Sequence, residues 1–238
     1  MSYIYILCHN ESTLLPHTIA HYKKYLPNCI ITIYDNESID NSVEIATSLG
    51  CNVISWNSGN IMDEHKQKDV KNNCWKNIAN AWVLVIDMDE WLCVSEKQLQ
   101  EERESGTTIL KTLGINMIGE SKSITLDDIN LHDIVKGVKW PMESKSLCFY
   151  TGDSGIKQIN YDLGAHRSSP IGNVKYSENV YVNKHMCYLG LPFIIDKMVK
   201  RYERSKKMQS QGLNIHYTGN VSKITDEYNK FLMKVNKS

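Results

Sequence analysis

WVLVIDMD, residues 82–89, is an apolar run that ends in two acidic residues one position apart. The length of the run and its β-branched residues predict a strand that is buried on both faces. In open α/β sheets, ligands bind at the carboxyl ends of the parallel strands. We therefore expect Asp87 and Asp89 at such an edge, although Asp is also common in ordinary turns.

The chain before this run alternates strand patterns with helical patterns. We expect strands at 3–8, 29–34, 51–56 and 82–86, and helices at 14–25, 40–49 and 66–81. Asp40 is the expected N-cap of the second helix, and Gly50 the residue just past its end. Alternation of this kind predicts a mostly parallel sheet with helices on its faces.

Polar residues follow each predicted strand of this first part. They are His9 to Glu11, Asp35 to Ser38, Asn57, and the pair Asp87 and Asp89. Because parallel strands end at the same edge of a sheet, these side chains are expected to converge there. This convergence is the strongest argument for a site that the residues themselves supply.

The second part of the chain is less regular. Strand patterns lie at 107–110, 146–150 and 180–183, and helical patterns run from Pro192 to about Gln211 and from Thr225 to Val235. Neither an internal repeat nor a low-complexity linker interrupts the chain. We expect one domain over 1–238, in which a boundary near residue 105 separates two halves of one site.

Composition bounds the class of protein. The 238 residues are 42% hydrophobic and 23% charged, and the formal net charge is zero. A neutral chain offers no general electrostatic attraction for nucleic acid. The seven cysteines are scattered and never form C-x-x-C, which favours reduced thiols over a disulfide framework or a thiolate zinc site. With no signal-peptide pattern and no run of transmembrane length, the expected location is the cytoplasm.

Several common active-site motifs are missing from the sequence. No G-x-G-x-x-G follows the first strand, no G-K-[ST] occurs, and no Ser or Cys stands in a nucleophile-elbow context. Dinucleotide-binding, P-loop and hydrolase interpretations therefore lack support. A bound phosphate would instead need a metal ion and basic side chains.

Three motifs follow one another along the chain: CHNE at 8–11, DNESID at 35–40 and DMDE at 87–90. Together they resemble a family 2-type glycosyltransferase with the GT-A fold, of the branch often found in polysaccharide-synthesis clusters. The stretches 164–166, 184–190 and 201–206 resemble the same branch. The resemblance implies an α/β fold with a Rossmann-like, mostly parallel central sheet flanked by helices, an irregular acceptor-side second half and C-terminal helices.

The resemblance also implies an activity. It is metal-dependent, hexosyltransferase-like transfer of a sugar from a nucleotide-diphosphate sugar, with a UDP-sugar favoured, to a saccharide or glycolipid acceptor, with inversion. The cofactor is Mn²⁺ or Mg²⁺. Residues 1–105 form the nucleotide-sugar-binding half, 106–190 the acceptor-side half, and 191–238 a C-terminal helical segment.

Site residues follow from the same resemblance. Asp35 is expected to bond the nucleotide base with Lys71 nearby, Asp87 to hold the ribose, Asp89 to bind the metal, and His185 to complete its shell. The remaining residues of the nucleotide-sugar site are Cys8, Asn10, Glu11, Asn36, Met88 and Arg201. Turn and cap roles explain Asp35 equally well, and a helical lysine such as Lys71 is commonly solvated.

The general base is the least determined residue, because the second half carries no clear Glu-Asp pair. We assign the catalytic roles to Asp162 and His166, with Glu143 and Glu178 as further candidates. The helix from Lys197 to Lys207 is basic, which is typical of a solvated face. Alternatively, it is a cationic lid over the diphosphate, or a surface for peripheral contact with an anionic membrane.

Two other functions compete with sugar transfer. A nucleotidyltransferase also presents paired acids to a metal and a nucleotide, but it normally needs a Gly-rich basic loop after the first strand, and residues 8–12 are neither. A non-catalytic binding or scaffold protein with the same fold is the other alternative. Asp35, Asp87, Asp89 and His185 argue against it, whereas the missing general base argues for it.

Overall fold

The computed structural model describes residues 1–237. Within them, a nine-stranded sheet has the order β3-β2-β1-β4-β8-β6-β11-β5, and β7 pairs with β6. Its strands are β1 (Ser2–Cys8), β2 (Cys29–Asp35), β3 (Asn52–Ser55), β4 (Trp82–Asp87), β5 (Glu90–Leu92), β6 (Ile109–Ile118), β7 (Gly137–Lys139), β8 (Cys148–Tyr150) and β11 (Tyr176–Tyr188). A small separate sheet pairs β9 (Ile156–Gln158) with β10 (Ile171–Gly172).

The first four strands are parallel, as predicted. β1 pairs with β2 on one side and with β4 on the other, and β2 pairs with β3. Cys8 lies opposite Asp35, and Leu7 lies opposite Asp87, so the polar segments after these strands meet at one edge. The predicted α/β fold with a mostly parallel central sheet flanked by helices is confirmed.

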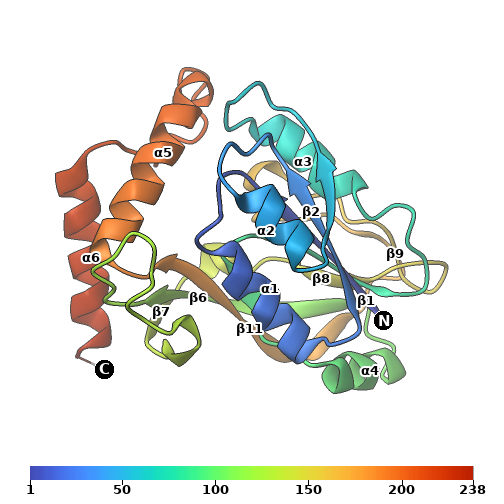
Figure 1. The fold of residues 1–238 in the computed structure, drawn as a ribbon. Coiled ribbons are helices and arrows are strands. Elements are labelled where there is room, and N and C mark those ends of the chain that lie inside the picture. The colour runs from blue at the N-terminus through green and yellow to red at the C-terminus, as the bar shows by residue number, and fades with distance from the viewer. Residues whose placement is uncertain (238) are drawn as a thin grey trace.

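Helices cover both faces of this sheet. α1 (Leu15–Tyr25), α2 (Ser42–Ser48) and α4 (Glu96–Glu104) contribute to the core that contains Ile4 and Ile6 of β1. Tyr5 points to the opposite face, where the segment after α3 (Glu64–Asn73) packs on Val83 and Val85 of β4. The alternation of β1 and β4 side chains between these cores is what a strand buried on both faces requires. Figure 1 shows α1 and α2 in front of the sheet.

The last two helices form a separate layer beside the sheet. α5 (Leu191–Gln209) and α6 (Val221–Val235) pack on each other and on the ends of β6 and β11 (Figure 1). Ile194 and Phe231 are core residues of this third cluster. Both helices were predicted. α6 begins four residues earlier than expected, at Val221, because the Asn220 side chain accepts a hydrogen bond from Lys223 N.

Two predicted helix boundaries in the first half are wrong. Asp40 does not cap α2, which begins at Ser42; its carboxylate instead accepts hydrogen bonds from Ser12 N and Ser42. α3 begins at Glu64 and ends at Asn73, whereas we expected 66–81. The earlier start follows from Asp63, whose side chain accepts from the first free backbone N–H groups.

The second half contains more strand than the sequence predicted. β6 and β11 span ten and thirteen residues, and pair in parallel with each other, whereas the expected strands were 107–110 and 180–183. Polar residues break their apolar pattern, yet these residues are buried and bonded: Asn183 Nδ2 donates to Glu143 O, and Asn116 Oδ1 accepts from His185. In the first half, the strand β5 and the helix α4 also had no counterpart in the prediction.

All seven cysteines have free thiols, in agreement with the expectation of reduced cysteines. Among residues 1–237, no helix combines the length and the apolar composition needed to cross a membrane.

Candidate functional site

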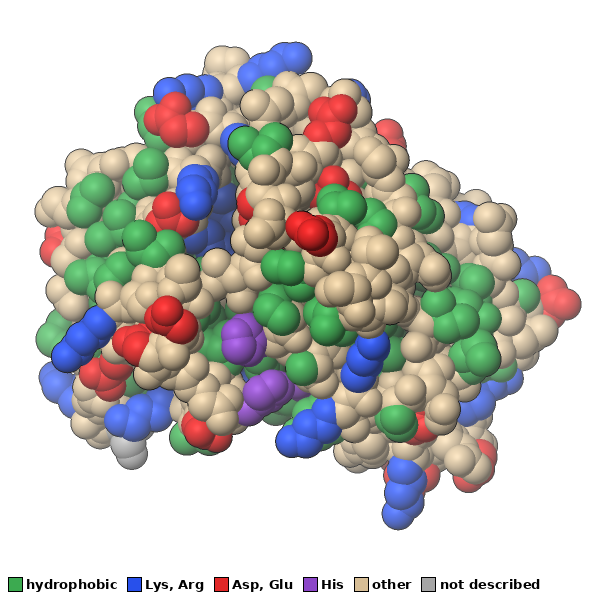
Figure 2. Space-filling model, viewed as in Figure 1, with side chains coloured by type: hydrophobic (Ala, Val, Ile, Leu, Met, Phe, Trp, Pro, Cys, Tyr) green, Lys and Arg blue, Asp and Glu red, His purple; other side chains and the backbone are tan. Residues whose placement is uncertain are grey.

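A pocket of about 1230 Å³ lies at the carboxyl ends of β1, β2 and β4, with α5 forming its opposite wall. Figure 2 shows this hollow beside α5, with Lys and Arg side chains recessed inside it. Most of the predicted site residues line it: Cys8, Asn10, Glu11, Asn36, Lys71, Asp87, Met88, Asp89, His166, His185 and Arg201. The structure therefore brings together residues that are up to 193 positions apart in the chain (8 to 201).

Asp35 and Asp162 are not among the pocket-lining residues. Asp162 is exposed. Asp35 is only 4% exposed; its Oδ2 atom accepts from Ser38 N at 3.0 Å. Its Oδ1 atom is buried and has no hydrogen-bond partner within the described residues. An orphaned carboxylate oxygen is costly, so Asp35 keeps an unused acceptor next to the pocket residue Asn36.

Asp87 ends β4 in contact with two ammonium groups. Lys71 Nζ lies 2.8 Å from its Oδ1 atom, and Lys145 Nζ lies 3.6 Å from its Oδ2 atom. Burial raises the pKa of Asp87, but Lys71 and Lys145 outweigh that effect and hold the pKa well below its usual range. Lys71 reaches this position from the last turn of α3, so the helix that the sequence predicted delivers the lysine.

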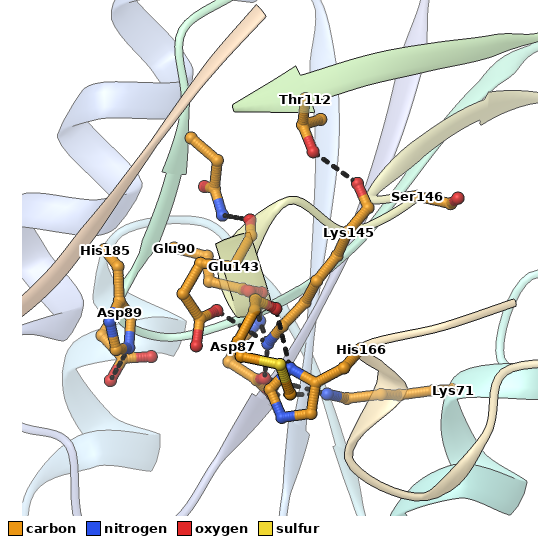
Figure 3. Close-up of polar contacts among 12 residues, drawn as sticks. Lys71, Asp87, Asp89, Glu90, Thr112, Glu143, Lys145, Ser146, His166 and His185 are labelled. Carbon is orange, nitrogen blue, oxygen red and sulfur yellow. Dashed lines mark hydrogen bonds and ion pairs between the residues drawn. The ribbon is translucent and has the colours of Figure 1, made fainter. Parts of the chain in front are cut away.

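Lys145 is the centre of a buried charge cluster behind Asp87. Its Nζ atom lies 2.8 Å from Glu90 Oε1 and 3.0 Å from Glu143 Oε2. Figure 3 shows Glu90, Glu143 and Asp87 converging on this lysine, with Lys71 arriving from the other side. Burial raises the pKa of Glu90. For Glu143, burial is outweighed by His185 and Lys145, and the pKa is lowered, so its carboxylate is ionised in the pocket at neutral pH.

Asp89 is 2% exposed, and three nitrogen atoms surround its Oδ2 atom. Lys197 Nζ lies at 2.8 Å, Arg201 Nη2 at 3.2 Å and His185 Nε2 at 3.4 Å. Burial raises the pKa of Asp89, but Lys197, His185 and Arg201 hold it well below its usual range. Lys197 and Arg201 both belong to α5, so their ion pairs with Asp89 connect this helix to the end of β4.

The residues present fit a divalent cation. Oxygen, nitrogen and sulfur atoms of Asp89, His185 and Cys187 lie within 4.8 Å of one another. Because an amide oxygen only accepts, His185 Nδ1 donates to Asn116 Oδ1 at 2.6 Å, and this leaves Nε2 directed at Asp89 (Figure 3). Fixing one ring nitrogen in this way is how proteins orient a metal-binding histidine. Cys187 is the poorest of the three ligands, because burial raises the pKa of its thiol to about 12.

His185 reaches this position differently from the prediction. We expected it just beyond a strand ending at Asn183, but it lies inside β11, opposite Glu90 of β5 and Asn116 of β6. The side chain is 14% exposed. Its place is set by the long parallel pairing of β11 with β6, which the sequence pattern did not indicate.

The loop after β1 is held by its own polar side chains. Asn10 has a positive φ of 52°, and its Oδ1 atom accepts from Ile39 N. Asn36 Nδ2 donates to Ser58 Oγ. Asn10 and Asn36 thus shape the pocket wall. Glu11 instead faces α5, with Oε1 3.9 Å from Lys197 Nζ.

α5 also contacts the loop between β3 and α3. Met62 N donates to Arg204 O at 2.9 Å, and Arg204 Nη2 donates to Ile61 O at 3.3 Å. Met62 and Arg204 both line the pocket. We define these two hydrogen bonds as the Arg204 bridge, which joins two walls of the pocket.

His166 follows the short 3-10 helix η3 (Leu163–Ala165) and donates from Nδ1 to Met142 O at 2.8 Å. Met142 belongs to η2 (Pro141–Glu143), which also carries Glu143. His166 therefore contacts the segment that positions Glu143.

Sequence reasoning did not select several residues of the site. Glu90 belongs to the DMDE motif but had no predicted role, Lys145 and Asn116 had none either, and Lys197 was predicted only as part of a basic helix. Glu90 directly follows the two acids, so its position was a usable signal. Lys145 had none, because its partners lie at positions 87, 90 and 143, which only the folded sheet brings together.

No protein-family model matches this chain, and no curated protein matches its sequence. Solved structures do. S. aureus TarS is 12% identical over 95% of this chain and 42% of that chain, with a TM-score of 0.48. CMP:2-keto-3-deoxy-manno-octonic acid synthetase complexed with CTP is 10% identical over 48% of this chain and 52% of that one, at 0.35. The mannosyltransferase PcManGT from Pyrobaculum calidifontis, in complex with GDP-Man and Mn²⁺, is 8% identical over 47% and 34%, at 0.35.

The chain spans less than half of the full TarS chain and about half of the synthetase chain. The identities and TM-scores are too low to assign a function to this chain, so its function has to be argued from the pocket.

Proposed function

We propose that this chain is a glycosyltransferase that uses Mn²⁺ or Mg²⁺, takes its sugar from a nucleotide-diphosphate donor, with UDP preferred, and passes it with inversion to a hydroxyl of a saccharide or glycolipid. The observation that carries the proposal is the pair Asp87 and Asp89 at the end of β4. Each contacts two basic side chains and both line one pocket, with the Asp89 side chain 3% exposed and the Asp87 side chain 30% exposed. This arrangement combines metal-binding oxygen with positive charge for a diphosphate.

Two contacts of the donor half lie in the pocket: Asp87 is an acceptor for the ribose hydroxyls, and Lys197 with Arg201 supplies positive charge for the diphosphate. Asp35 does not line the pocket, but its Oδ1 atom has no partner among the described residues and lies beside the pocket residue Asn36, so we propose it as the acceptor for the nucleotide base. An Arg fork suits phosphate oxygens in particular. Asp89 and His185 are the residues that would hold the cation.

In the reaction, the acceptor oxygen forms a bond to the anomeric carbon of the sugar while the bond from that carbon to the diphosphate oxygen breaks. Negative charge grows on the leaving diphosphate, where Arg201 and Lys197 stabilise it. A bound divalent cation supplies further Lewis-acid stabilisation of the same oxygens.

We assign to Glu143, in preference to Asp162, the role of the general base that removes the proton from the acceptor hydroxyl. Glu143 lines the pocket, is 7% exposed and is ionised, whereas Asp162 is exposed outside it. His166 holds the Glu143 segment through Met142 O. A positioned base contributes roughly 10²- to 10⁴-fold in rate.

The first experiment measures thermal stabilisation by UDP, GDP, CMP and dTDP, with and without Mn²⁺. At about a hundred times its Kd, a ligand adds roughly 2.7 kcal/mol to the free energy of unfolding, which is readily detected. We expect one nucleotide to stabilise the wild type only with Mn²⁺, and Asp89→Asn to lose that response. Asp69→Asn, an exposed aspartate on α3, is the matched control. If none of the nucleotides stabilises the wild type, the proposal is wrong.

A product assay separates the proposed activity from its two rivals. With the stabilising nucleotide's sugar donor, a glycosyltransferase releases nucleoside diphosphate, while a nucleotidyltransferase forms or consumes pyrophosphate, and a scaffold does neither. Glu143→Gln is expected to keep nucleotide binding and to lose transfer by about 10²-fold or more. If this variant transfers sugar as fast as the wild type, Glu143 is not the general base, and Asp162 or His166 is the candidate for that role.

A further inference from the structure

Asp89, the aspartate assigned to the metal, is already neutralised by side chains. Lys197 Nζ lies 2.8 Å from Oδ2 and Arg201 Nη2 lies 3.2 Å from the same atom. Glu11 is the only other carboxylate described near Lys197, with Oε1 at 3.9 Å. Among the described residues, these two carboxylates therefore face two permanent cations, and His185 also contacts Asp89, so their negative charge is compensated without a metal.

A divalent cation on Asp89 would add two positive charges to this balanced group. It would share the Asp89 carboxylate with Lys197 and Arg201. Like charges in a buried site repel strongly. A nucleoside diphosphate removes this conflict, because its anionic oxygens accept contacts from the lysine, the arginine and the metal together.

Building on the proposed function, we propose that Lys197 competes with the divalent cation for Asp89, and that the donor diphosphate draws the lysine away. The metal then binds tightly only together with the nucleotide. Three features support this role. Lys197 is 8% exposed, it lies on α5 in the wall opposite β4, and its ammonium group makes ion pairs with both carboxylates.

Lys197 could instead replace the metal entirely, with the ammonium group alone facing the diphosphate. The ligand geometry favours competition over replacement. His185 has one nitrogen fixed by Asn116 and the other directed at Asp89, and this orientation would let the imidazole and the carboxylate hold one cation together.

The test measures Mn²⁺ binding directly, by electron paramagnetic resonance titration of free Mn²⁺, first without nucleotide. A charge within about 4–6 Å changes proton affinity by roughly one to three pKa units, so removing Lys197 should tighten Mn²⁺ binding by about tenfold or more. Lys197→Met keeps the length of the side chain without its charge. Lys197→Arg keeps the charge and should bind Mn²⁺ as weakly as the wild type.

Lys206→Met is the matched control. Lys206 lies on the same helix, is exposed and pairs with Glu203, and its removal should leave Mn²⁺ affinity unchanged. Arg201→Met is a second variant, expected to tighten Mn²⁺ binding in the same direction. It keeps the test informative if Lys197→Met does not fold, which a thermal melt establishes beforehand.

The nucleotide is then added at saturation. In the wild type it should tighten Mn²⁺ binding by at least about tenfold, and in Lys197→Met by clearly less, because the competitor is already gone. Mn²⁺ affinity that is unchanged or weaker in Lys197→Met overturns the competition. So does a wild type that binds no Mn²⁺ with nucleotide present, which would leave Lys197 in the place of the metal.

These results are independent of whether sugar is transferred. Transfer by a wild type whose Mn²⁺ affinity is insensitive to Lys197 would refute the competition and leave the proposed function standing. Tighter Mn²⁺ binding by Lys197→Met without sugar transfer would leave the competition standing and remove the function.

Discussion

At the level of single residues, the site is a set of buried charges that only work in combination. Asp87 is held by Lys71 and Lys145, and Asp89 by Lys197 and Arg201. Removing one partner of a buried pair leaves a charge uncompensated, which costs far more than the pair contributes over apolar residues.

Lys71→Met should lower the free energy of unfolding at pH 7 by about 1–3 kcal/mol, less than for a fully buried pair, because the Asp87 side chain is 30% exposed and keeps its contact with Lys145. Because the folded-state pKa of Asp87 lies below its unfolded value, its pairing is fully stabilising above about pH 4 and is lost as the pH falls further. Urea unfolding should therefore show a large difference between variant and wild type at pH 7 and a smaller one at pH 3. Adding Asp87→Asn to the variant should recover part of the loss; a double variant less stable than the single one would contradict this account.

His21 predicts a different pH dependence. It is 3% exposed, stacks on Trp91, and donates from Nε2 to Leu92 O at 3.1 Å. Burial lowers its pKa to about 4. As the pH falls from about 6.5 to about 4, the unfolded chain binds a proton at His21 and the folded protein does not, so the free energy of unfolding decreases over this range. Above about pH 6.5 the ring is neutral in both states and has no such effect.

His21→Phe keeps the stacking but cannot be protonated. Its stability should fall by about 3 kcal/mol less than that of the wild type between pH 7 and pH 4, as measured by denaturant unfolding. His65→Phe, at an exposed histidine, should follow the wild type. Parallel curves for His21→Phe and the wild type would show that His21 does not titrate in this range.

At the level of elements, α5 links structure to site. Ile194 anchors it in the third core cluster, and Phe193 packs in the core that contains Ile4 and Ile6. Lys197, Arg201 and Arg204 project from the same helix into the pocket. The helix begins with Leu191 and Pro192, and proline is favoured in the first turn because no backbone N–H is needed there.

Ile194→Ala should destabilise the protein by about 2–5 kcal/mol, because Ile194 is fully buried and the cavity cannot be refilled without moving α5. Thermal or denaturant unfolding measures the loss. Ile215→Ala, at a residue that is 73% exposed, should change stability by less than about 0.5 kcal/mol. Equal effects of the two substitutions would mean that α5 is not held by its core.

At the level of the whole molecule, the two halves share one sheet. β4, the last long strand of the first half, pairs with β8 of the second half, and Val83 and Val85 pack on Phe149 and Ile156. A fragment of residues 1–105 would leave one edge of β4 and much of this core open to water.

We therefore expect the full chain to unfold in a single transition, with the same midpoint by near-ultraviolet circular dichroism and by tryptophan fluorescence. The fragment 1–105 should lack a cooperative transition. Two separate transitions in the full chain, or cooperative unfolding of the fragment, would show that the halves are independent domains.

The sequence predicted best where the structure is local. Apolar runs with turn residues between them identified β1, β2 and β4, and the polar segments after these three strands identified the pocket wall at their carboxyl ends. Helix ends were predicted less well, because side-chain contacts made in three dimensions decide them: the Asp40 carboxylate bonds Ser12 N across the pocket wall and does not cap α2.

Long-range pairing accounts for the rest. β6 and β11 carry buried asparagines, Asn116 and Asn183, that make a strand look polar in sequence. The cluster around Lys145 depends on this pairing, since Asn183 Nδ2 holds Glu143 O. No periodic pattern in the sequence predicts that contact, so the positions of Glu143 and Lys145 in the site follow only from the folded structure.

The Arg204 bridge has a kinetic consequence. It consists of two hydrogen bonds between α5 and residues 61–62, and each contributes only about 0.5–1.5 kcal/mol net. Because these two hydrogen bonds are weak, they break and re-form many times while a tightly bound ligand remains in the pocket. The bridge can therefore hold these two walls together in the ligand-free pocket without setting the rate at which a tightly bound ligand dissociates.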